Sequence, residues 1–198
     1  MIDKLQALQV LEKRKDYTSL DIIELQNKRN KFLNWLSMNY FLDDLRVFEM
    51  YMIDNDIVKT SYDKYQFFNP LHNTRTKINS ETCLEIDKLD FDKTIALMCE
   101  IILSLMRDKI HFAVFYARHQ RSPHIRIYDF EELNELNPQQ RIKAQILFWR
   151  KHVPFGCFQY IDTGIFVDEH ELQLEFSPHW KYGSIFDLLF EYVPEEIK

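Results

Sequence analysis

Glycine and cysteine are scarce in this chain of 198 residues, which contains only 3 of each. So few glycines exclude the glycine-rich loops that hold phosphates, and the sequence has neither a P-loop nor a dinucleotide-binding fingerprint. The cysteines, Cys83, Cys99 and Cys157, are far apart and form no Cys-x-x-Cys pair. We therefore expect no disulfide framework and no structural zinc site, and we expect a reducing, cytoplasmic location.

Long apolar runs and an excess of basic charge are also missing. No run is apolar over the roughly 20 residues that a membrane span needs, and the first residues lack a signal-peptide pattern. The formal net charge of −6 argues against a broadly basic nucleic-acid surface but leaves room for a local basic groove. At 198 residues we expect one domain with a sizeable core, and the absence of a long apolar run predicts no membrane partner.

Residues 1–78 are predicted to be a helical segment packed on the core. Leucines near the start and apolar residues from Phe32 to Leu45 recur at helical spacing. Residues 57–82 contain turn-forming Asn and Pro and are predicted to be mostly loop. Their aromatic side chains alternate with basic ones, a combination that can stack on nucleotides, although covering the rim of the core is the preferred explanation.

Residues 79–198 are predicted to form the core of an α/β (α+β) protein. A strand at Cys83–Asp87 precedes a helix that Asp90 caps and that ends near Arg107. Strands are expected at 110–116 and 124–128. A strand, a crossover helix and paired strands predict an RRM-like, split βαβ core.

The second half of this core is predicted from local signals. Asn137-Pro138 begins a helix that runs to about His152, with Ile142, Ala144, Ile146 and Leu147 facing inward. Strands are expected at 158–162 and 171–176, and a helix or a strand at 185–192. Asp162 ends the first of these strands.

Polar side chains occupy one face of two predicted strands. Glu85 and Asp87 point away from the apolar side chains between and beside them, because side chains alternate along a strand. His124 and Arg126 do the same on a later strand. Carboxylates suit Mg²⁺ or Mn²⁺, and guanidinium suits phosphate oxygens, so the pattern indicates a site for a metal and a phosphate.

Four short motifs, in order, resemble those of the archaeo-eukaryotic primase superfamily. Glu85-Ile86-Asp87 is similar to its first motif, Ser122-Pro123-His124 to its small-x-His motif, and Ile161-Asp162 to its third. Ser177-Pro178-His179-Trp180-Lys181-Tyr182-Gly183 is similar to its Ser-x-His-x-Lys-Thr-Gly loop, with Tyr182 in place of Thr. The chain has Glu85 where the family usually has Asp, and Gln173 where it often has Arg. The resemblance covers roughly residues 83–184.

The resemblance implies a DNA primase or primase-polymerase, a nucleotidyltransferase that makes or extends primers on a single-stranded DNA template. In such two-metal chemistry, two divalent ions about 4 Å apart activate the attacking oxygen and stabilise the leaving group. Mg²⁺ or Mn²⁺ would be held by Glu85, Asp87 and Asp162. The nucleoside triphosphate would contact the residues Ser122, His124, His179 and Lys181 by resemblance, and Arg121 and Arg126 on chemical grounds. Net acidity suggests that a second primase or replication subunit helps to grip the template.

Two other classes of protein remain open from the residues. A catalytically degenerate primase-like or RRM-like adaptor of a replication or repair complex would use Phe115, Tyr116 and Tyr128 for packing or base stacking. An HUH-type replication initiator also has an RRM-like core, and Pro123-His124-Ile125-Arg126 is similar to its metal-binding strand. That strand carries two histidines, however, and here Arg126 stands in the place of the second.

Overall fold

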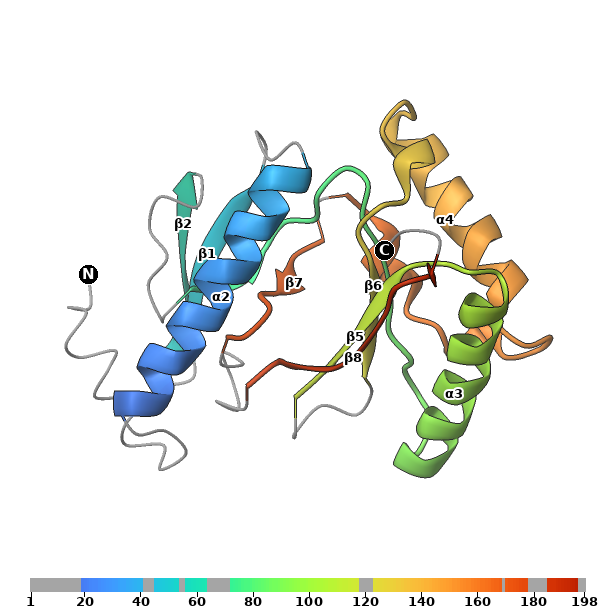
Figure 1. The fold of residues 1–198 in the computed structure, drawn as a ribbon, viewed down its shortest axis with the longest axis horizontal. Coiled ribbons are helices and arrows are strands. Elements are labelled where there is room, and N and C mark those ends of the chain that lie inside the picture. Colours follow the sequence, from blue (N-terminus) through green and yellow to red (C-terminus); the bar gives the residue numbers. More distant parts are fainter. Residues whose placement is uncertain are drawn as a thin grey trace. The chain divides into compact units, whose positions relative to one another are not determined.

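The computed structural model describes residues 19–40, 45–53, 56–63, 72–117, 123–168, 170–177 and 185–195 (Figure 1). The chain divides into two compact units. The first comprises Met1–Thr76, Ala117–His119 and Glu171–Asp187, and the second comprises Lys77–Tyr116, Gln120–His170 and Leu188–Lys198. The first boundary, at Thr76, is two residues from the predicted one at residue 78. Residues 171–187, which the sequence predicts to be part of the core, belong to the first unit.

The first unit combines one long helix with a sheet. The helix α2 spans Ser19–Asn39, and Arg29, Leu33 and Leu36 lie buried on one of its faces. The sheet has the order β2-β1-β3-β7. Its strands are β1 (Arg46–Ile53), β2 (Asp56–Asp63), β3 (His72–Arg75) and β7 (Leu172–Gln173). All three pairings are antiparallel, and the β1–β3 pairing is irregular between Phe48 and Glu49.

The prediction of a wholly helical segment followed by a loop was wrong for this unit. The strands β1 and β2 pair along their full length, from Arg46 opposite Asp63 to Ile53 opposite Asp56. The structure of this segment is decided by pairing with other strands, which the local spacing of apolar residues does not report. Two residues, Asp54 and Asn55, separate the strands, and these residue types favour tight hairpin turns.

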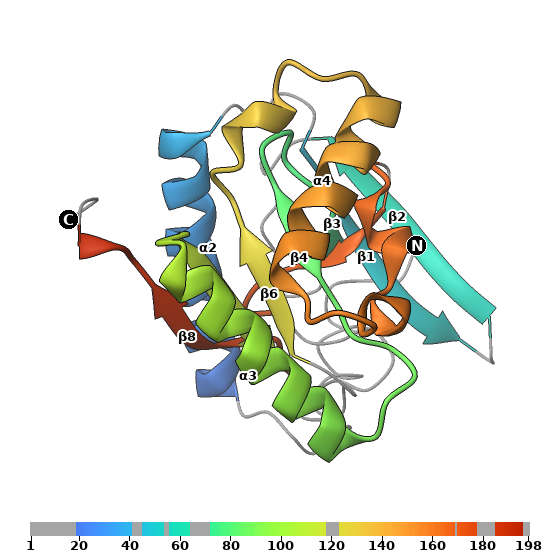
Figure 2. The same cartoon turned by 90° about the vertical axis from the view of Figure 1, so that its right-hand side faces the viewer.

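The second unit follows the predicted order of elements as far as the helix that ends at His152. Its elements are β4 (Thr82–Leu84), α3 (Phe91–Arg107), β5 (Phe112–Tyr116), β6 (His124–Ile127), the 3-10 helix η2 (Glu131–Leu133), α4 (Pro138–His152), the 3-10 helices η3 (Phe158–Tyr160) and η4 (Thr163–Phe166), and β8 (Asp187–Tyr192). The sheet has the order β4-β6-β5-β8. Both α3 and α4 lie on one side of this sheet (Figure 2).

The two helices begin where the sequence predicts. The Asp90 carboxylate accepts a hydrogen bond from the Lys93 amide, and α3 ends at Arg107. A capping box formed by Asn137 and Gln140, with Pro138 at the first position, begins α4. The Thr82 hydroxyl on β4 accepts a 2.9 Å hydrogen bond from the indole nitrogen of Trp149 on α4. Thr82 and its alternate neighbours therefore face the helices.

Two details of α4 and the segment after it correct the prediction. The residues of α4 that are buried are Gln145, Trp149 and His152, whereas Leu147, which was predicted to face inward, is 68% exposed. The segment 158–162 is not a strand along its length. Phe158–Tyr160 is a 3-10 helix, and only Ile161 pairs with the sheet, through an antiparallel bridge to Ile86. None of the helices in the described ranges is long and apolar enough to cross a membrane.

Candidate functional site

Glu85 lies between His124 and Asp162 on the edge of the second sheet. The pairing of β4 with β6 places Leu84 opposite Ile125, so the next step of the register places Glu85 beside His124. On the other side, the amide of Asp162 donates a 3.0 Å hydrogen bond to the Glu85 carbonyl oxygen. His124 of the second motif and Asp162 of the third thus lie beside Glu85 of the first, at one end of β4.

Glu85, Asp87 and Asp162 share the face of the sheet that points away from the helices. Ile86 and Ile161 are opposite each other and buried, so their neighbours along the chain point to the other face. The amide of Asp87 donates a 2.7 Å hydrogen bond to the Tyr160 carbonyl oxygen, and the side chain of Asp87 is exposed. This arrangement places three carboxylates on two adjacent segments.

The Glu85 carboxylate forms an ion pair with His124. The Nε2 atom of His124 lies 3.4 Å from Oε1 of Glu85, and the His124 side chain is only 7% exposed. Burial alone would raise the pKa of the Glu85 carboxyl. The charge of His124 and its hydrogen bond, together with Arg126 and His170, outweigh burial and lower that pKa to about 2. Glu85 is therefore an anion over the whole physiological pH range.

The Asp162 carboxylate caps the turn that follows it. Its Oδ1 atom accepts a 2.9 Å hydrogen bond from the Gly164 amide, at the start of η4. A Cβ atom at Gly164 would come within 3.1 Å of the same oxygen. The absence of a side chain at Gly164 thus leaves room for the Asp162 carboxylate, which is half-buried beside the Glu85 backbone.

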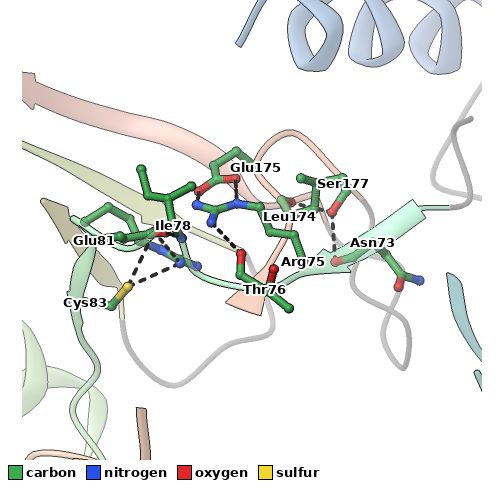
Figure 3. Close-up of polar contacts among 10 residues, drawn as sticks. Asn73, Arg75, Thr76, Ile78, Glu81, Cys83, Leu174, Glu175 and Ser177 are labelled. Carbon is green, nitrogen blue, oxygen red and sulfur yellow. Dashed lines mark hydrogen bonds and ion pairs between the residues drawn. The ribbon is translucent and has the colours of Figure 1, made fainter. Parts of the chain in front are cut away.

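Arg126 lies inside the unit rather than at the surface. Its side chain is fully buried, and Nη1 lies 3.2 Å from Oε1 of Glu81 and 3.4 Å from Sγ of Cys83. The Cys83 thiol contacts the same Glu81 oxygen (Figure 3). Glu81 was not among the predicted site residues. Continuing the alternation of Glu85 and Cys83 back by one step along the strand leads to it. The predicted contact of Arg126 with a nucleotide stays a prediction.

Two more titratable side chains near these residues, Lys77 and His170, were not among the predicted site residues. Lys77 is buried and donates a 2.8 Å hydrogen bond from Nζ to the Ile165 carbonyl oxygen. Burial lowers the pKa of Lys77, while Cys83 and Glu81 oppose that shift. Burial also lowers the pKa of His170, and the charges of Asp162 and Glu85 oppose it. No motif marks these positions, because neither residue belongs to a regular strand or helix.

The three carboxylates fit a hard divalent cation in kind and in backbone position. Oxygen donors are the ligands that Mg²⁺ and Mn²⁺ prefer. Within the described part of the chain, however, no three His, Cys, Asp or Glu side chains are already gathered around one point. Metal binding at this place would require the three carboxylates to move closer together than they lie in the structure.

The remaining predicted nucleotide contacts lie outside the described residues. These are Arg121, Ser122, His179 and Lys181. Ser177, the first residue of the Ser-x-His-x-Lys motif, is described in the first unit and is buried. Its hydroxyl donates hydrogen bonds to the carbonyl oxygens of Leu174 and Asn73 (Figure 3). Gln173 donates a 3.3 Å hydrogen bond from Nε2 to the Ser177 carbonyl oxygen.

Comparisons of the chain with protein-family models, curated proteins and solved structures found no match.

Proposed function

We propose that this chain is a template-dependent nucleotidyltransferase of the primase type, which synthesises or extends short primers on single-stranded DNA. The observation that supports this proposal is the position of Glu85, which lies beside His124 on one side and Asp162 on the other. These residues come from three separate motifs, and chance resemblance in sequence does not require their motifs to meet.

The connectivity of the second unit supports the finer proposal of an RRM-like, primase-like core. The chain runs β4, α3, β5, β6 and α4, and then returns to the sheet at Ile161. The resulting order places Ile161 beside the β4 segment, followed by β6 and β5. This order, with both helices on one side, is the one expected of a split βαβ core.

The proposed roles follow from the chemistry of each group. Glu85, Asp87 and Asp162 would hold Mg²⁺ or Mn²⁺, which when bound neutralises charge on a triphosphate. The His124 imidazole contacts a carboxylate in the structure, and its N–H would donate to a phosphate oxygen in the same way. Lys77 and Arg126 keep positive charge beneath this face. Ser122, Arg121, His179 and Lys181 remain predicted nucleotide contacts.

The test is primer synthesis and extension on single-stranded DNA with Mn²⁺ or Mg²⁺. Asp87 is exposed, so Asp87→Ala should fold normally. We expect product from the unmodified chain and a loss of at least roughly 100-fold with Asp87→Ala, since a metal-holding carboxylate is removed. Asp92→Ala, which removes an exposed carboxylate in the first turn of α3, should retain activity. Equal activity of all three proteins would contradict the assignment.

A second candidate function is a degenerate primase-like or RRM-like adaptor subunit. Two observations favour it: the ion pair of Glu85 with His124, and the burial of Arg126 against Glu81. Both occupy groups that catalysis would use. An adaptor would give no primer product and no metal-dependent binding of nucleoside triphosphate in calorimetry, whereas the enzyme would give both. Gel filtration with candidate replication subunits then tests whether a partner supplies the grip on the template.

A further inference from the structure

The helix α4 carries only basic charge in a chain that is acidic overall. Its sequence, PQQRIKAQILFWRKH, has four Arg and Lys residues and no Asp or Glu. The chain as a whole has 25 basic and 31 acidic residues. A uniformly basic helix is therefore a departure from the rest of the molecule.

The basic residues that are exposed lie along one stripe of α4. Lys143, Leu147, Arg150 and Lys151 are exposed and follow the helical spacing of three and four residues. The opposite face of α4 is the buried one, with Gln145 and Trp149 against Thr82 of β4. The stripe thus points away from the sheet and lies apart from the face that carries Glu85.

An exposed aromatic side chain follows α4 in the chain, three residues beyond the last residue of the helix. Phe155 is 107% exposed, and no other large apolar side chain among the described residues exceeds it. The turn around it is fixed by a 3.0 Å hydrogen bond from the Cys157 amide to the Pro154 carbonyl oxygen, and by Gly156 with φ of +80°. The Arg150 guanidinium lies 5.2 Å from the centroid of the Phe158 ring. Aromatic and cationic groups are thus held together.

Local stability does not explain the whole stripe. Basic residues in the last turn complement the helix dipole, which accounts for Arg150 and Lys151. The helix dipole does not account for Lys143, which is further from the end of the helix. Nor does it account for Leu147 and Phe155, since exposing apolar side chains to water does not stabilise the fold. Lys151 contacts Asp108 at 2.7 Å, whereas Lys143 and Arg150 lie on a surface without an acidic neighbour on the same helix.

We infer that Lys143, Leu147, Arg150 and Phe155 form a binding surface for single-stranded nucleic acid. Basic side chains along a helix neutralise successive phosphates, and an exposed ring at the end offers a stacking platform for an unpaired base. The positive charge of Lys143 and Arg150 favours a polyanion. The exposed ring of Phe155 favours a polyanion with unpaired bases on which it can stack. That the strand is the template rests on the proposed function, but the affinity for single strands does not.

The test is fluorescence anisotropy with a labelled dT20 oligonucleotide, without metal or nucleotide, over a range of salt concentrations. Phe155→Ala should weaken binding by roughly 5- to 150-fold, since stacking of one base contributes about 1–3 kcal/mol. The double variant Lys143→Gln/Arg150→Gln should reduce the magnitude of the salt slope by about 1.4, or about 0.7 for each phosphate contact on a single strand. Leu103→Ala and Lys31→Gln alter exposed residues elsewhere and are the matched controls.

The outcomes are distinct. Weaker binding by the surface variants and unchanged binding by the controls supports the surface, whatever primer synthesis shows. Absence of dT20 binding in 50 mM salt, equal binding by all variants, or preference for duplex DNA or for anionic vesicles overturns it. If binding fails while Asp87→Ala still abolishes primer synthesis, the surface is wrong and the proposed function stands. If the surface variants weaken binding as expected while Asp87→Ala has no effect on primer synthesis, the surface stands and the proposed function is wrong.

Discussion

The amide nitrogen of Asp162 donates a 3.0 Å hydrogen bond to the carbonyl oxygen of Glu85, which joins two acidic motifs that are far apart in the sequence. The bond fixes the backbone of both residues, while their side chains hold different partners. Glu85 contacts His124, and Asp162 contacts the Gly164 amide. The backbone frame is therefore rigid, and function depends on which partner each carboxylate keeps.

The first prediction concerns stability at acid pH. The folded chain holds the pKa of Glu85 at about 2, compared with an ordinary value of 4.5. Since the folded pKa is lowered, the stabilisation is complete above about pH 4.5 and is lost as the pH falls toward 2. With the Glu85 side chain 30% exposed, we expect about 1–3 kcal/mol to be lost across this window.

Urea unfolding at pH 5.5 and pH 3 measures this loss. Glu85→Gln should be less stable than the unmodified chain at pH 5.5 and should lose less stability on acidification. Glu132→Gln, which replaces an exposed carboxylate in η2, should leave the pH dependence as it is. A parallel decline for Glu85→Gln and the unmodified chain would contradict the assigned ion pair.

The second prediction concerns Arg75 and Glu175 in the first unit. Both side chains are fully buried and form two hydrogen bonds, Nε to Oε2 at 2.9 Å and Nη2 to Oε1 at 2.6 Å (Figure 3). Glu175→Ala should destabilise the fold by about 3–5 kcal/mol, because it leaves a buried guanidinium without its carboxylate. The double variant Arg75→Met/Glu175→Leu should recover much of that loss.

The control for this pair is Lys28 and Glu24, an exposed ion pair on α2 at 3.3 Å. Glu24→Ala should change the free energy of unfolding by less than about 0.5 kcal/mol. Urea unfolding followed by circular dichroism measures both. If Glu175→Ala were as mild as Glu24→Ala, the buried pair would not hold the first unit together.

Local signals predicted the ends of the helices, and pairings between distant segments escaped prediction. Asp90 and Asn137 cap their helices through side chains that are three residues from the amides they bind, so the sequence around each position contains the whole interaction. The strand β1 depends on β2 and β3, and nothing within Arg46–Ile53 identifies those partners. The prediction from local apolar spacing therefore continued the helix beyond Asn39, where α2 ends.

In the candidate site, too, local patterns were predictable and contacts between strands were not. Alternation along the chain predicts a shared face for Glu85 with Asp87, and for His124 with Arg126. It could not predict that Arg126 would be fully buried against Glu81, since burial depends on the pairing of Cys83 with Arg126. Likewise, apolar periodicity placed Leu147 inward, but hydrogen bonds of Thr82 with Trp149 and Gln145 turned α4 the other way.

The third prediction concerns His111, which lies between two carboxylates. Its Nδ1 atom is 3.4 Å from Asp129, and its Nε2 atom is 3.1 Å from Glu191 on β8. The hydrogen bond to Asp129 raises the pKa of His111, burial opposes that shift, and the hydrogen bond to Glu191 adds to it. Because the folded pKa is raised, the stabilisation is complete below about pH 6.5 and is lost as the pH rises through the folded pKa.

Hydrogen exchange of the β8 amides, corrected for the intrinsic pH dependence, reports this loss. We expect weaker protection of Leu188–Tyr192 at pH 8.5 than at pH 6, equivalent to about 1 kcal/mol after allowing for the exposure of Glu191. His111→Gln should remove the pH dependence while Phe112 still packs against Phe190. If the pH dependence of protection persists in His111→Gln, a group other than His111 is responsible for it.

The fourth prediction concerns Thr82, which attaches α4 to the sheet. Its hydroxyl accepts from Trp149 at 2.9 Å and donates to Gln145 at 3.1 Å, and all three residues are buried. Thr82→Val keeps the shape but leaves an indole N–H and an amide oxygen with one partner fewer. We expect a loss of about 1–3 kcal/mol in the free energy of unfolding.

Thr94 on α3 provides a matched control for this substitution. It is also buried, but its hydroxyl has no hydrogen-bond partner within the described residues. Thr94→Val should therefore be neutral or stabilising, because it removes an unsatisfied polar atom from the interior. Urea unfolding of the two variants gives the comparison. Equal destabilisation of the two variants would contradict the view that the hydrogen bonds of Thr82 fix the face that α4 presents to the sheet.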